Sequence, residues 1–69
     1  MDNKSYIMSL LVLNKTSVAK LAAEMTKLLG KKYSRGSIYG KLDRDTLTYK
    51  EVQAIAKILG YRVDIVREN

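Results

Sequence analysis

The chain has 69 residues, 46% of them apolar, and its 13 lysine and arginine residues outnumber its 7 aspartate and glutamate residues to give a net charge of +6. A chain of this length forms one small domain and buries roughly 60% of the surface that it exposes when unfolded. The absence of cysteine and histidine excludes disulfide bonds, zinc fingers, thiol nucleophiles and the commonest general base. We therefore expect no enzyme, no metal site, no cofactor and no small-molecule ligand.

The first two segments show apolar residues at helical spacing. A helix is expected over about residues 3–13, and its apolar stripe comprises Tyr6, Ile7, Leu10, Leu11 and Leu13. A second helix is expected over about residues 17–29, with Ser17 as its N-cap and Gly30 just after its last turn. Its stripe comprises Val18, Leu21, Ala22, Met25, Leu28 and Leu29.

The third expected helix, over about residues 34–42, has few residues for a core. Ser34 is its N-cap, and Tyr33 and Ile38 occupy the two positions of a hydrophobic staple around that cap. Ile38 and Leu42 are its only strong apolar anchors. A helix of this composition presents most of its surface to something outside the core.

A fourth helix is expected over about residues 48–59, because Thr48 and Glu51 form a capping box and Gly60 follows the last turn. A strand is expected over residues 61–66, where the alternating apolar positions are Tyr61, Val63 and Ile65. No second strand is evident, so we expect this strand to pair with that of a second copy in a homodimer. The alternative is a monomer, in which the strand folds back on the first helix of its own chain or pairs with a short N-terminal extension.

Two glycines face outward on the third helix. At about 100° per residue, Gly36 and Gly40 lie nearly opposite Ile38, with Ser37 and Tyr39 beside them. Each glycine costs a helix interior about 1 kcal/mol relative to alanine. Either the glycines allow close approach of a partner, or a short helix held by its neighbours tolerates them. The surrounding basic residues favour close approach.

Positive charge gathers around this helix. Between Lys27 and Arg44 there are six basic residues and one acidic residue, Asp43. Such a concentration indicates a polyanionic partner.

Three short motifs carry a resemblance to a known family. They are Leu21-Ala22, then Ser34-Arg35-Gly36-Ser37-Ile38, and then Glu51-Val52 followed by Ile55-Ala56-Lys57-Ile58-Leu59-Gly60. In this order they resemble the Cro/lambda-repressor-type (XRE-type) helix-turn-helix family. The resemblance implies a mainly α, compact four-helix domain, here with one short C-terminal β-strand. It also implies that helix 34–42 lies in the major groove of DNA and that helix 17–29 crosses above it.

The chain departs from the family pattern between the second and third helices. Thr26 stands where the family usually has glycine, and residues 26–33 lengthen the turn by about five or six residues relative to the family. We expect the fold to tolerate this insertion, because the apolar stripes govern helix packing. The orientation on DNA is left open.

The resemblance assigns roles to polar residues of the third helix and its flanks. The candidates for base contact are Arg35, Ser37 and Tyr39, and those for close approach are Gly36 and Gly40. The candidates for phosphate contact are Lys31, Lys32, Ser34, Lys41 and Arg44. For each lysine, an ordinary solvated surface charge is the alternative.

We therefore expect sequence-preferring binding of double-stranded DNA by a small transcriptional regulator of phage or mobile-element type. The expected location is the cytoplasm, in association with the nucleoid, since the apolar runs are too short to span a bilayer. The alternative is a protein-interaction module of the same fold that binds an acidic protein partner. Duplex binding with a steep salt dependence distinguishes the two.

Overall fold

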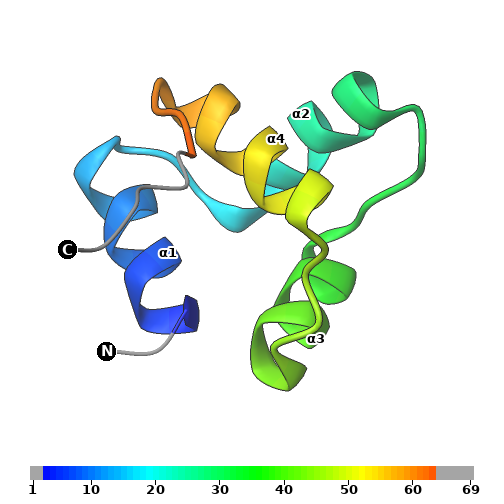
Figure 1. The fold of residues 1–69 in the computed structure, drawn as a ribbon, viewed down its shortest axis with the longest axis horizontal. Coiled ribbons are helices and arrows are strands. Elements are labelled where there is room, and N and C mark those ends of the chain that lie inside the picture. Colours follow the sequence, from blue (N-terminus) through cyan, green and yellow to red (C-terminus); the bar gives the residue numbers. More distant parts are fainter. Residues whose placement is uncertain (1–2, 64–69) are drawn as a thin grey trace, which may run out of the picture.

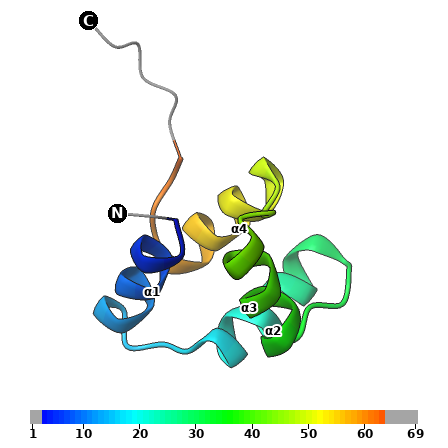
Figure 2. The same cartoon turned by 90° about the horizontal axis from the view of Figure 1, so that it is seen from below.

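The computed structural model describes residues 3–63, which fold into four helices (Figure 1). These are α1 (Asn3–Leu13), α2 (Val18–Leu29), α3 (Arg35–Arg44) and α4 (Tyr49–Leu59). The expectation of a mainly α fold with four helices is confirmed, and α3 extends two residues beyond its expected end. In both views α1 lies at one side of the fold and the connection between α2 and α3 lies at the other (Figures 1 and 2).

The helix ends follow from local chemistry. The side chains of Ser17, Ser34 and Thr48 each accept a hydrogen bond from a backbone N–H in the first turn of α2, α3 and α4. Gly30 and Gly60 end α2 and α4 in the left-handed conformation, with φ of 69° and 89°. These caps satisfy backbone groups that the helix itself leaves without partners.

The core lies where the inner faces of the helices meet. Met25 of α2 and Ile38 of α3 are completely enclosed, at 0% exposure. The core consists of Ile7, Leu11, Val18, Leu21, Ala22, Met25, Tyr33, Ile38, Leu42 and Ile55. Because α2 packs against both α3 and α4, its stripe holds the short α3 against the rest of the domain.

The stripe expected for the first helix is only partly correct. Ile7 and Leu11 are buried, but Tyr6 is 56% exposed and Leu13 is 70% exposed. Apolar residues surround α1 on almost every side, so spacing alone does not identify the face that joins the core. Tertiary packing selects that face.

The expected C-terminal strand is not seen. Residues 61–63 follow α4 without forming a strand with any other described part of the chain, and residues 64–66, with Ile65, lie outside the described residues. A strand needs a paired edge, and the described residues offer only helices and loops. Tyr61 and Val63 instead line a hollow between α1 and α4. The strand and its dimer contact stay predictions.

Candidate functional site

α2 continues past Thr26 to Leu29, and residues 30–34 connect it to α3. Thr26 also holds this connection in place. Its hydroxyl donates to the carbonyl oxygen of Ala22 at 2.9 Å and accepts from the backbone N–H of Tyr33 at 2.9 Å. Thr26 therefore ties the end of the connection back onto α2.

Two serines form a reciprocal cap at the start of α3. The Ser34 hydroxyl accepts from the N–H of Ser37 at 3.1 Å, and the Ser37 hydroxyl accepts from the N–H of Ser34 at 2.9 Å. The Ser37 hydroxyl also donates to the Ser34 carbonyl oxygen at 2.9 Å. With its hydrogen used in the cap, Ser37 retains one lone pair and can only accept from a ligand.

The two outward glycines of α3 differ in their surroundings. Gly36 is exposed, and a Cβ atom added to it would meet nothing within 4 Å. Gly40 is half-buried, and an added Cβ would lie 3.1 Å from Nη1 of Arg44. The Arg44 side chain therefore lies back along the helix over Gly40. Open space for a close partner exists at Gly36, and Gly40 makes room for a guanidinium group.

A second guanidinium group lies at the other end of α3. The Arg35 guanidinium stacks over the ring of Tyr39, with its carbon 5.5 Å from the ring centroid. Tyr39 is half-buried and packs against the core. Of these two candidates for base contact, Arg35 is exposed and Tyr39 serves as the platform beneath it. Arg35 and Arg44 thus lie at the two ends of the glycine-bearing helix.

Lys31 and Lys32 are exposed in the connection before α3. The Lys31 ammonium lies 5.9 Å from the ring centroid of Tyr33. Within residues 3–63 neither lysine forms an ion pair. Both charges are therefore available to an anion in solvent.

Lys41 differs from the other expected phosphate contacts. Its ammonium lies 3.4 Å from Oε2 of Glu51, a carboxylate that is only 3% exposed as a residue. The Tyr33 hydroxyl donates to the same oxygen at 2.7 Å, and the N–H of Thr48 donates to Oε1 at 2.9 Å. Lys41 thus pairs with α4 and neutralises a buried charge. The capping box pointed to Glu51 and Thr48, but no sequence spacing marks Tyr33 and Lys41 as their partners.

This network sets the protonation of two groups. Burial by itself would raise the pKa of Glu51, but the hydrogen bonds from Thr48 and Tyr33 and the charge of Lys41 outweigh burial and lower it. Burial, the hydrogen bond to Glu51 and the negative charge of Glu51 together raise the pKa of Tyr33 to about 12. At neutral pH the carboxylate is charged and the phenol is protonated.

The acidic residues at the end of α3 are also paired. Asp43 accepts from the ammonium of Lys4 at 2.6 Å, and Asp45 accepts from the side-chain amide of Asn3 at 2.9 Å. Both contacts tie the first turn of α1 to the end of α3. The positive charge of Lys4 also offsets the negative charge of Asp43 beside the basic residues of α3.

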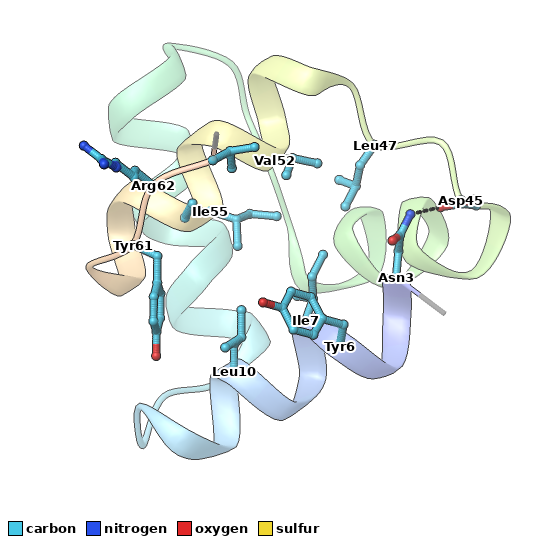
Figure 3. Close-up of a pocket in the computed structure, with 12 residues that line it drawn as sticks. Asn3, Tyr6, Ile7, Leu10, Asp45, Leu47, Val52, Ile55, Tyr61 and Arg62 are labelled. Atoms are coloured by element: carbon cyan, nitrogen blue, oxygen red, sulfur yellow. Dashed lines mark hydrogen bonds between the residues drawn. The ribbon is translucent and has the colours of Figure 1, made fainter. Parts of the chain in front are cut away.

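The hollow between α1, α4 and residues 61–63 has a volume of about 380 Å³ and is mainly apolar (Figure 3). Ile7, Leu10 and Ile55 form part of its wall, and the Asn3–Asp45 hydrogen bond lies at one end. Among the described residues, no group of three or more acidic, histidine or cysteine side chains is placed to hold a metal ion. None of the described helices is long and apolar enough to cross a membrane.

Comparison with protein-family models, with curated proteins and with solved structures finds no match to this chain. The geometry of α3 and its surroundings is therefore the basis for inferring a function.

The Glu51 network predicts an acid-dependent stability. Because the folded-state pKa of Glu51 is lowered, the unfolded chain binds this proton at higher pH than the folded chain does. The stabilisation is therefore present above the unfolded-state pKa and is lost as the pH falls through the folded-state pKa. Urea unfolding of the native chain and of Glu51→Gln, between about pH 7 and pH 3, measures this. We expect the loss of stability on acidification to be smaller in the variant, and equal losses would contradict the network.

The position of Lys41 predicts that it contributes to stability and that Lys32 does not. Lys41→Gln should lower the free energy of unfolding by about 1–3 kcal/mol, between the values for exposed and buried ion pairs. Lys32→Gln is the matched control, because Lys32 is exposed, and it should change stability by less than about 0.5 kcal/mol. Urea denaturation at neutral pH measures both. Equal effects would show that Lys41 is an ordinary surface charge.

Proposed function

We propose that this protein binds double-stranded DNA with a sequence preference and that α3 lies in the major groove. The observation that supports this most is the exposed surface of α3. It has open space at Gly36, the Arg35 guanidinium over the Tyr39 ring and the Arg44 guanidinium over Gly40. A major groove about 12 Å wide admits a helix, and a helix without large side chains on its outer face enters it most deeply. Arginine is the commonest reader of guanine in that groove.

The electrostatics support the same function. The chain has a net charge of +6, and Lys31 and Lys32 stand exposed just before the N-terminus of α3. Cations in this position fit phosphate groups beside the groove, which hold a protein in register without reading sequence. Ser34 lies at the same corner, and its hydroxyl accepts from the N–H of Ser37 in the cap, which leaves the hydroxyl hydrogen to donate to a phosphate.

The geometry divides the proposed roles among the residues of α3. Arg35 is the principal candidate for base contact, and Tyr39 orients it from below. Arg44 reaches the exposed surface beside Gly40 and contacts phosphate or base. Ser37 accepts a hydrogen bond from a base amino group. Lys41 holds α3 against α4 through its ion pair with Glu51. Its role is to position the helix, and it does not itself contact phosphate.

In this proposal the protein is a small lambda-repressor-like helix-turn-helix regulator of phage or mobile-element type that acts at the nucleoid in the cytoplasm. A homodimer would bring two copies of α3 to successive major grooves, about 34 Å apart, and would read a palindromic site. Pairing of residues 61–66 between copies is one way to form that dimer.

A protein-interaction module with an acidic partner is the second candidate. The lengthened connection at residues 30–34, which carries Lys31 and Lys32, favours it because the connection alters the family's relation between α2 and α3. An acidic protein surface would meet the same cations as DNA does. Selection of bound sequences from random duplex DNA separates the two candidates. An enriched, palindromic sequence supports DNA binding, and no retention of duplex at low salt supports the protein partner.

Two substitutions separate base contact from phosphate contact. Arg35→Ala should cost about 1–3 kcal/mol of binding free energy on the selected site and should relax the preference at one base pair. Lys32→Ala should weaken binding to all duplexes alike and reduce the salt slope by about one. Fluorescence anisotropy with the selected and a scrambled duplex, over a series of salt concentrations, measures both. Sequence-independent effects of both variants would mean that Arg35 contacts only phosphate.

The open space at Gly36 predicts a variant that folds but does not bind. Gly36→Leu adds a side chain where nothing lies within 4 Å, so the free energy of unfolding should be retained or raised. The same side chain would keep α3 from entering the groove and should abolish duplex binding. Gln53→Leu, at an exposed position of α4, adds similar bulk elsewhere and should bind normally. Undiminished binding by Gly36→Leu would remove the close-approach role of this glycine.

A further inference from the structure

Three lysines from three different segments line one hollow on the flank of α3. The hollow has a volume of about 250 Å³, and the lysines are Lys31 from the connection before α3, Lys41 from α3 and Lys50 from the first turn of α4. Lys50 lies nine positions after Lys41 in the sequence, and the packing of α4 brings it to the same hollow. The fold therefore gathers positive charge here that no single helix face carries.

The protein itself does not balance this charge. Glu51 is the only acidic residue among those that line the hollow, and the ammonium of Lys41 lies 3.4 Å from its carboxylate. Within residues 3–63, Lys31 and Lys50 form no ion pair, and both are exposed. Two positive charges at one hollow repel each other, and an anion between them removes that repulsion. The hollow is therefore complementary to an anion.

The other polar groups around the hollow also suit a ligand that accepts hydrogen bonds. The Tyr33 hydroxyl and the N–H of Thr48 both donate to the Glu51 carboxylate and are fully used. The Thr48 hydroxyl accepts from the N–H of Glu51 at 3.1 Å, so its own hydrogen is left to donate. The hollow thus offers two ammonium groups and one hydroxyl, which are all donors. Lysine binds phosphate as a point charge, and phosphate oxygens accept from all three groups.

We propose that Lys31 and Lys50 together hold one backbone phosphate of double-stranded DNA in this hollow. The inference rests on the proposed function, since a helix in the major groove brings its flanks to the phosphates on the groove rim. Lys41 stays paired with Glu51 and keeps that carboxylate from repelling the phosphate. The site extends the DNA contact from α3 to α4.

A salt series with single and double variants tests whether the two lysines share a phosphate. The logarithm of the association constant falls with the logarithm of the salt concentration by about 0.9 for each phosphate that the protein neutralises. Replacing both Lys31 and Lys50 by glutamine should therefore lower this slope by about 0.9 and weaken binding roughly eightfold at about 0.1 M salt. The loss should be the same for the selected and the scrambled duplex. Lys50→Gln alone should weaken both duplexes by a smaller factor, because Lys31 still holds the phosphate.

Lys57→Gln is the matched control. Lys57 is exposed in the last turn of α4 and does not line the hollow. Its replacement removes the same charge from the same helix and should change the affinity by less than about twofold. Because Lys50 and Lys57 are both exposed, neither variant should shift the urea midpoint.

A larger loss of affinity in Lys50→Gln than in Lys57→Gln, with a slope change of about 0.9 in the double variant, supports the shared site. Equal effects of Lys50→Gln and Lys57→Gln on a chain that binds duplex overturn the shared site and leave the proposed function standing. A slope change of about 1.8 in the double variant also overturns it, because the two lysines then contact separate phosphates. A native chain that retains no duplex at low salt overturns the proposed function and this inference together.

Discussion

The placement of α3 depends on the buried carboxylate of Glu51. A buried charge is costly unless it is paired and hydrogen-bonded. This carboxylate accepts hydrogen bonds from the Tyr33 hydroxyl, just before α3, and from the N–H of Thr48, and it is paired with the ammonium of Lys41 from α3. The Glu51 carboxylate therefore joins the N-terminal cap of α4 to Tyr33, just before α3, and to Lys41, in the last turn of α3. Since Ile38 and Leu42 are the only fully buried side chains of α3, this polar network adds orientation to what the small core supplies.

The network also explains why the basic residues near α3 are not equivalent. The Lys41 ammonium is paired with Glu51 of α4, and its positive charge stabilises that carboxylate. Arg35 is held by the ring of Tyr39, and Arg44 lies over Gly40. Guanidinium groups that are oriented by their neighbours lose less side-chain entropy on binding than freely moving ones. The guanidinium groups on the surface of α3 are therefore partly ordered by their own neighbours.

Charge is distributed unevenly over the molecule. Five of the 13 basic residues lie in α3 and the connection before it, whereas residues 5–14 carry none. The pairs Lys4–Asp43 and Asn3–Asp45 lie at the boundary between these two regions and join α1 to α3.

The sequence by itself determined the four helices and their caps, because periodicity and capping act over three or four residues, as at Ser34 and at Thr48 with Glu51. It also indicated the outward glycines of α3. Only tertiary structure decided that Tyr33 and Lys41 converge on Glu51, residues 18 and 10 positions away, since no local pattern records such contacts. Tertiary packing likewise decided which side of α1 is buried. Its apolar residues surround the helix, and only neighbouring helices can select among equivalent faces.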